Sequence, residues 1–126
     1  MKNEKPQEKD KKDLRYRSYV FSLDIISLLE KLPKNYIYEI LGKQVLRSAT
    51  SIGANIVEAQ AGSSKKDFVR FYQIALKSCN EIKYWLSIFK IKQKDNLKIE
   101  ELLNEAIELG NILGASIITM KSKRKL

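Results

Sequence analysis

The chain has 126 residues, 44% of them hydrophobic, and a formal net charge of +9. This length fits one domain, and the hydrophobic fraction excludes a disordered chain. The single cysteine, Cys79, and the absence of histidine exclude an intramolecular disulfide, a multi-cysteine metal site and histidine-dependent catalysis. We therefore expect neither a metal nor a cofactor.

Both ends of the chain are charged. Residues 1–13 hold five lysines and four acids and lack the apolar region of a signal peptide, so we predict a flexible arm. Residues 121–126 form a basic tail with four cations and no acid: Lys121, Lys123, Arg124 and Lys125. The longest uncharged run, residues 109–120, is shorter than the roughly 20 residues of a membrane-spanning helix. We expect a cytoplasmic protein without a membrane partner.

Four segments between these ends place small or apolar residues alternately three and four positions apart, which is the spacing of one helix face. The segments are residues 14–32, 41–59, 68–89 and 99–120. Short connections separate them, at Pro33, at residues 61–64 and at residues 93–96. Ser64 precedes Asp67 by three residues, as in a helix-capping box.

Short loops between long helices favour antiparallel neighbours. The sequence therefore predicts an all-α, up-down-up-down four-helix bundle over residues 14–120. We expect helices of similar length, roughly 20–24 residues or about 30–36 Å each. Helix content should exceed about 70%, well above the average for globular proteins.

Small residues in the second and fourth helices suggest close helix packing. Glycine within a helix costs roughly 1 kcal/mol relative to alanine, so Gly53 is expected to let another helix approach closely. Gly110 and Gly114 form a G-x-x-x-G pattern with the same interpretation.

A polar stripe borders the apolar face of the second helix and has two interpretations. It comprises Arg47, Ser51, Asn55 and Glu58, to which we add Glu81 of the third helix. These residues either bind a ligand or form a hydrogen-bonded network that fixes helix register. We prefer the structural interpretation, because buried polar groups must be paired.

Basic residues alternate with aromatic ones along the third helix. The basic residues are Lys65, Lys66, Arg70, Lys77 and Lys83. Together with the basic tail they are candidates for nucleic-acid binding, since aromatic rings beside cations can stack on single-stranded bases. Only some of these residues can share one helix face. The alternative is that the aromatic residues are core and the lysines are solvated.

Sequence motifs of common enzymes are missing, including G-x-G-x-x-G, the P-loop, H-E-x-x-H and G-x-S-x-G. We expect no enzymatic activity and no catalytic residue.

The first helix carries more apolar surface than one bundle core needs: Tyr16, Tyr19, Val20, Leu23, Ile26 and Leu29. Because large exposed apolar patches mark interfaces, we predict self-association.

Five runs of residues carry a resemblance to a known family. They are residues 46–60 (LRSATSIGANIVEAQ), 64–68 (SKKDF), 74–77 (IALK), Glu81 with 84–86 (YWL), and 108–114 (ELGNILG). These runs resemble the bacterial four-helix-bundle family, also called 23S rRNA-intervening-sequence or S23-like proteins. The resemblance covers roughly residues 14–120.

The resemblance implies a left-handed bundle that assembles into a homo-oligomer, with a pentamer favoured. A similar bundle is the accessory protein of diversity-generating retroelements, and this resemblance implies RNA or DNA and a reverse transcriptase as partners. We thus expect a non-enzymatic, homo-oligomeric accessory protein that binds nucleic acid. The alternative is a small-molecule-binding bundle or an enzyme that uses the stripe around Asn55 and Glu58.

Overall fold

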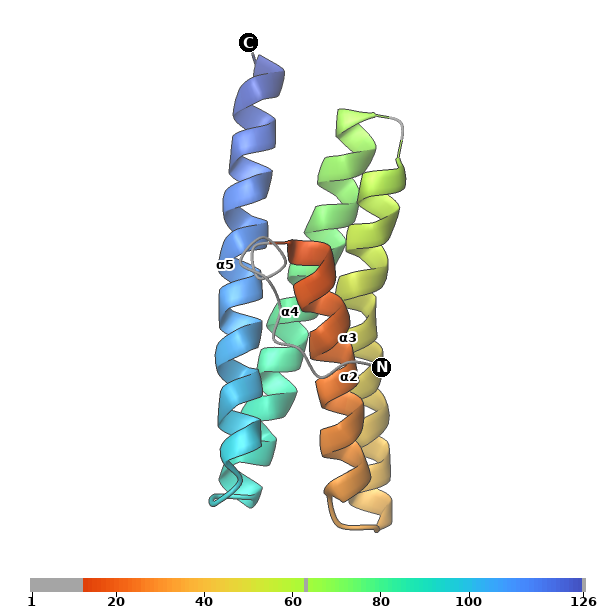
Figure 1. Ribbon diagram of the computed structural model, residues 1–126, viewed down its shortest axis with the longest axis vertical. Coiled ribbons are helices and arrows are strands. Elements are labelled where there is room, and N and C mark those ends of the chain that lie inside the picture. The colour runs from red at the N-terminus through yellow and green to blue at the C-terminus, as the bar shows by residue number, and fades with distance from the viewer. Residues whose placement is uncertain (1–12, 63, 126) are drawn as a thin grey trace, which may run out of the picture.

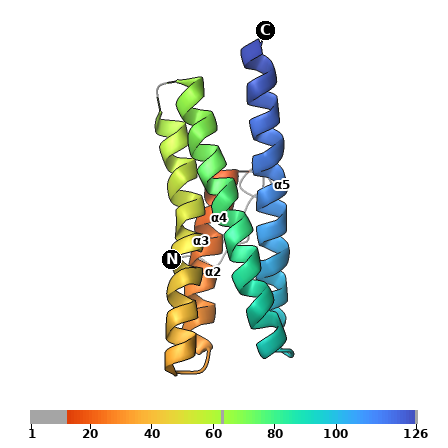
Figure 2. The same cartoon turned by 180° about the vertical axis from the view of Figure 1, so that it is seen from behind.

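A computed structural model describes residues 13–62 and 64–125, with side chains as far as residue 123. Four helices follow one another: α2 (Leu14–Lys31), α3 (Tyr36–Ala61), α4 (Lys65–Lys92) and α5 (Leu97–Lys125). They run alternately up and down, with short connections at both ends (Figures 1 and 2). The predicted all-α, up-down-up-down bundle is confirmed, whereas its handedness stays a prediction.

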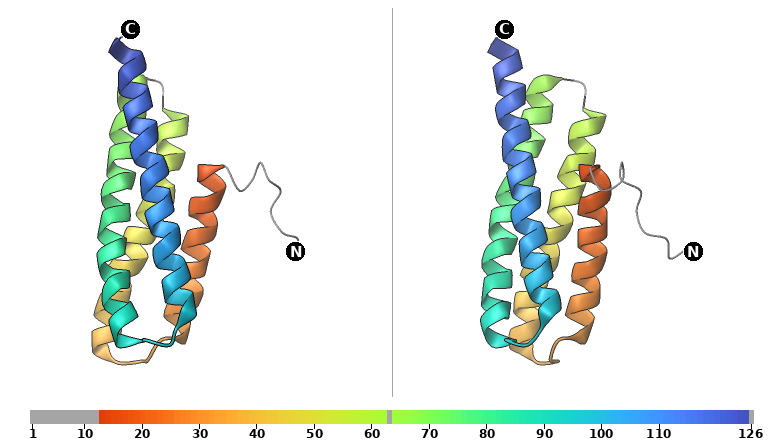
Figure 3. Two further views of the ribbon diagram at one scale, coloured as in Figure 1. Left: turned by 90° about the vertical axis from the view of Figure 1, so that its left-hand side faces the viewer. Right: turned by 60° about the vertical axis from the view of Figure 1, so that its left-hand side comes forward.

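Each helix packs against two others around one core. α3 contacts α2 and α4, and α5 contacts α4 and α2, so the diagonal pairs are α2–α4 and α3–α5. The contact between α2 and α5 is the least extensive of the four. Figure 3 shows this arrangement from two sides, with the N-terminal end of α2 well below the end of α5.

The predicted helical stripes form the core. Every stripe residue of α2 is buried, from Leu14 through Phe21 and Ile25 to Leu32. In α5 the stripe is buried from Ile99 to Ile117, and in α4 from Tyr72 to Phe89. In α3, Asn55 belongs to the predicted stripe but is only half-buried. Its neighbour Ile56 lies outside that stripe and is fully buried.

Local signals in the sequence set the helix ends. The Ser64 hydroxyl accepts a hydrogen bond from the Asp67 backbone N–H at 3.0 Å, as the capping pattern predicts. Asn35 caps α3 in the same way through the Tyr38 N–H. α2 ends at Lys31, two residues before Pro33, because proline disfavours helical backbone in the residue before it.

The helices differ in length, although similar lengths were expected. α2 has 18 residues and α5 has 29, so α2 does not reach the end of the bundle at which α5 finishes (Figure 1). Of the described helices, α3, α4 and α5 reach that end and α2 does not. The basic residues from 121 onwards continue α5 to Lys125 instead of following it. The predicted N-terminal arm lies outside the described residues except for Asp13, and so do the side chains of Arg124 and Lys125.

Gly53 lies at a close approach of two helices, as expected. A Cβ added there would lie 3.3 Å from the Ser18 Oγ of α2, so a larger residue would push α2 away from α3. Gly110 and Gly114 do not lie at a close approach of this kind. A Cβ on Gly110 would make ordinary contacts at 3.8 Å or more, and one on Gly114 would meet no atom within 4 Å. The described helices therefore do not require glycine at these two positions.

Candidate functional site

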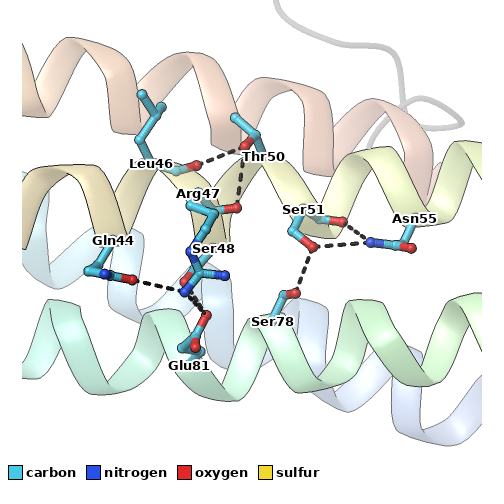
Figure 4. Close-up of polar contacts among 9 residues, drawn as sticks. All are labelled: Gln44, Leu46, Arg47, Ser48, Thr50, Ser51, Asn55, Ser78 and Glu81. Carbon is cyan, nitrogen blue, oxygen red and sulfur yellow. Dashed lines mark hydrogen bonds and ion pairs between the residues drawn. The ribbon is translucent and has the colours of Figure 1, made fainter.

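A hydrogen-bonded network joins α3 to α4 on one side of the bundle (Figure 4). The Glu81 carboxylate accepts hydrogen bonds from the Ser48 hydroxyl at 2.5 Å and from the Arg47 guanidinium at 3.0 Å. Arg47 also donates to the Gln44 side chain at 2.9 Å. Ser48 is fully buried, so its hydroxyl needs this partner.

A separate set of hydrogen bonds lies further along the same two helices, and we count both sets as the polar network of α3 and α4 (Figure 4). The Ser51 hydroxyl accepts hydrogen bonds from Ser78 of α4 at 2.8 Å and from the Asn55 amide at 3.1 Å. Asn55 also donates to the Ser51 backbone carbonyl at 2.8 Å. These partners belong to the protein itself, so the arrangement favours the structural interpretation of the stripe over a ligand site.

The network differs in membership from the predicted stripe. Four predicted residues belong to it: Arg47, Ser51, Asn55 and Glu81. The Glu58 side chain is exposed and makes no hydrogen bond or ion pair with the described residues. Ser48, Ser78 and Gln44 belong to it but were missed. The available signal was a polar residue, Ser48, at an interior position of the helical stripe.

Replacing Asn55 with alanine is expected to lower the free energy of unfolding by about 1–3 kcal/mol, because the Ser51 oxygens lose a half-buried donor. Urea denaturation followed by circular dichroism measures this change. Glu58→Ala is the matched control on the same helix and should change stability by less than about 0.5 kcal/mol. Equal effects of the two substitutions would contradict this assignment.

The network also makes stability depend on pH. The hydrogen bond from Ser48, and then that from Arg47, lowers the pKa of the Glu81 carboxyl below its ordinary value. A carboxyl with a lowered folded-state pKa stabilises the fold above its unfolded pKa, near 4.3, and loses this contribution as pH falls through the folded value. Glu81→Gln should therefore destabilise the protein at pH 7 more than at pH 3. A constant difference between these pH values, measured by urea denaturation, would refute the expectation.

A second polar cluster joins α2 to α5 and was not predicted. The Arg17 guanidinium forms two hydrogen bonds with Glu105, at 3.0 and 2.7 Å, and one with Glu108 at 2.7 Å. The hydrogen bond with Glu105 raises the pKa of Arg17 further, against the opposing effect of burial. The Arg17 side chain is only 18% exposed. This cluster connects the two neighbouring helices that have the least extensive contact.

The predicted basic residues of α4 do not form one surface. Lys66, Arg70 and Lys77 are exposed and spaced by four and seven residues, which places them on one helix face. Arg70 lies 3.6 Å from Asp67 and stacks on Phe71 at 4.3 Å. Lys83 instead lies against Gly110 of α5.

Lysines from two distant parts of the sequence lie at the same end of the bundle. Lys65 and Lys66 begin α4, and Lys121 and Lys123 lie in the last turns of α5 (Figure 1). A pocket at this end is lined by both Lys65 and Met120, which confirms that the two segments adjoin. All four lysines are exposed, and we call them the basic end. The acids of the adjoining turns are Glu58 and Asp67.

Several chemical possibilities receive no support from the described residues. The described residues contain no group of three or more acidic, histidine or cysteine side chains that could hold a metal ion. None of the described helices is long and apolar enough to cross a membrane. Cys79 is buried, and burial raises the pKa of its thiol to about 12, so it is not a thiolate nucleophile at neutral pH.

Comparison with known proteins identifies the family. The family described as "23S rRNA-intervening sequence protein" matches residues 11–115. The chain belongs to this family. The resemblance recognised in the sequence is thereby confirmed.

A solved structure from the S23 ribosomal protein family has the same fold. It is a protein with unknown function from the S23 ribosomal protein family of Bacteroides thetaiotaomicron VPI-5482. The two chains are 34% identical, with a TM-score of 0.76, and the match covers 82% of this chain and 97% of the other. No protein of curated function matches. The comparisons establish family and fold, so function must be argued from the site.

Proposed function

We propose that this family member is a non-enzymatic homo-oligomer that binds RNA or DNA through the basic end. The observation that carries this proposal is the meeting of Lys65 and Lys66 with Lys121 and Lys123 at one end of the bundle. Phosphate groups are bound by such clusters of cations, largely without sequence preference.

Helix electrostatics argues that Lys65 and Lys66 are not there to stabilise α4. The N-terminal turn of a helix carries a partial positive charge, so cations are unfavourable in it and acids are favourable. Lys65 and Lys66 occupy this turn of α4. Lys121 and Lys123, by contrast, lie near the C-terminal end of α5, where cations are favourable. The first pair is thus better explained by an anionic partner than by the helix.

Self-association is supported by an apolar groove between α2 and α3. Its volume is about 510 Å³, and Tyr19 and Val57 in its lining are 61% and 47% exposed. The hydroxyls of Ser18, Ser22 and Thr50 also line it, but each donates to a backbone carbonyl of its own bundle. The other donors in its lining are the Arg15 guanidinium and the hydroxyls of Tyr16 and Tyr19. Because the lining is mainly apolar, the groove suits apolar side chains of another copy.

The mass of the assembly tests the oligomer. Light scattering at micromolar concentration should give a multiple of the 14.6 kDa chain mass. Leu23→Glu, in the exposed apolar row of α2, should lower that mass by placing a charge in the interface. A wild-type mass of one chain would refute the oligomer.

Nucleic-acid binding is tested with a pair of matched charge reversals. The double variant Lys65→Glu, Lys66→Glu should weaken binding of every sequence alike, by about tenfold or more at 100 mM salt. The double variant Lys92→Glu, Lys94→Glu makes the same charge change at the last residue of α4 and in the connection after it, at the opposite end of the bundle, and should change affinity much less. Fluorescence anisotropy with labelled 20-nucleotide strands and duplexes measures both.

The salt dependence provides a further readout. For the wild type, the logarithm of the binding constant should fall with the logarithm of salt concentration by about 0.7 per phosphate contacted on a single strand and about 0.9 on B-form DNA. Truncation after Met120 removes Lys121, Lys123, Arg124 and Lys125 and should make this slope shallower. If the wild type binds no probe at 50 mM salt and micromolar protein, the nucleic-acid proposal is wrong.

A further inference from the structure

The basic end contains a pocket that the lysines alone do not explain. It has a volume of about 420 Å³ and lies among the last turn of α3, the first turns of α4 and Met120 of α5. Among the described residues, α2 begins at Leu14 and does not extend to this end (Figure 3). It is an open depression of the surface and not an enclosed cavity, so a flat group bound there would keep one side in solvent.

The pocket combines an apolar lining with a polar rim. Phe68, Met120 and Ala59 supply the apolar lining, and Gln60, Ser64 and Lys65 supply polar groups. Phe68 is half-buried and stacks on the buried Tyr72 with ring centroids 4.2 Å apart. A third flat ring placed against Phe68 would extend this stack, and the flexible Met120 side chain can adapt to it.

We propose that this pocket receives an unpaired base of a single-stranded nucleic acid whose phosphates lie on the lysines of the basic end. The inference rests on the proposed function and names its ligand as single-stranded. In a duplex the faces of each base are covered by its neighbours, so only an unstacked base can enter a pocket with an aromatic wall. The positive charges of the lysines around the pocket are complementary to the negative charge of the strand that carries the base.

The test separates base binding from phosphate binding by changing the ligand. Affinities are measured by fluorescence anisotropy for a 20-nucleotide strand, an abasic strand with the same number of phosphates, and a duplex of equal length. RNA and DNA strands are both tested. The type of strand with the larger affinity difference between its base-containing and abasic forms identifies the ligand. Stacking of one base predicts binding of the base-containing strand about tenfold tighter than the abasic strand.

Two aromatic substitutions on the same helix form a matched pair. Phe68→Leu preserves an apolar side chain but removes the ring, and should abolish the tenfold difference between base-containing and abasic strands. Phe71→Leu makes the same change at a half-buried position outside the pocket lining and should leave that difference intact. Gln60→Leu, at an exposed position of the rim, provides a second probe of the pocket and should reduce the difference.

The outcomes distinguish this inference from the proposed function. Loss of the base-dependent difference in Phe68→Leu and its retention in Phe71→Leu would support the pocket. Equal affinity of the wild type for base-containing and abasic strands would overturn the pocket and leave phosphate binding standing. Absence of binding to all probes would overturn both.

Discussion

Replacing Phe21 with alanine is expected to lower the free energy of unfolding by about 3–5 kcal/mol. Phe21 is 1% exposed at the centre of α2 and is among the largest fully buried side chains. Its truncation removes apolar contacts and leaves a cavity, because neighbouring helices relax only in part. Since the total stability of a domain is typically about 5–15 kcal/mol, this single change should shift the urea unfolding midpoint strongly.

Tyr36→Ala is the control for this measurement. Tyr36 is an aromatic residue of the same bundle but is 70% exposed, so its truncation should change stability by no more than about 0.5 kcal/mol. Similar losses in the two variants would mean that the observed core does not determine stability.

Replacing Arg17 with alanine is expected to lower stability by about 2 kcal/mol, because Glu105 and Glu108 lose a charged donor in a partly buried position. Arg17→Lys should restore only part of this loss. An ammonium group cannot reproduce the paired hydrogen bonds that the planar guanidinium makes with Glu105. Chemical denaturation of both variants measures the difference.

Arg15→Ala separates this effect from a general loss of positive charge. Arg15 is exposed and lies two residues before Arg17 on the same helix. Its removal should have little effect on unfolding. If Arg15→Ala destabilises the protein as much as Arg17→Ala, the α2–α5 cluster is not the cause. Loss of the Arg17 effect in double variants that also lack Glu105 or Glu108 would confirm the pairing.

Local patterns in the sequence predict the fold because each depends on neighbours along the chain. The stripe from Leu14 to Leu32, the cap at Ser64 and the break at Pro33 act within one or two helical turns. Gly53 was also identified locally, from its cost within a helix. The family resemblance added a second route to the same fold.

Features that depend on distant partners could not be predicted in this way. Arg17 and Glu105 are 88 positions apart, and nothing in either local sequence names the other. The end of α5 was misplaced because periodicity of apolar residues stops at Met120, while a helix can continue through exposed lysines. Ser48 lies at an interior position of α3, but its partner Glu81 comes from another helix, so the sequence around Ser48 does not predict the pair.

The short α2 also divides the bundle into parts of unequal local stability. Near the connections at Pro33 and residues 93–96, opening any helix exposes contacts with two neighbours. The last turns of α5 lack α2 beside them, so they can open without unfolding the rest. Backbone amides near Ile117 should therefore exchange with solvent deuterium faster than those near Ala106, although both side chains are buried. The basic end would then be the part of the molecule best able to reshape itself around what it binds.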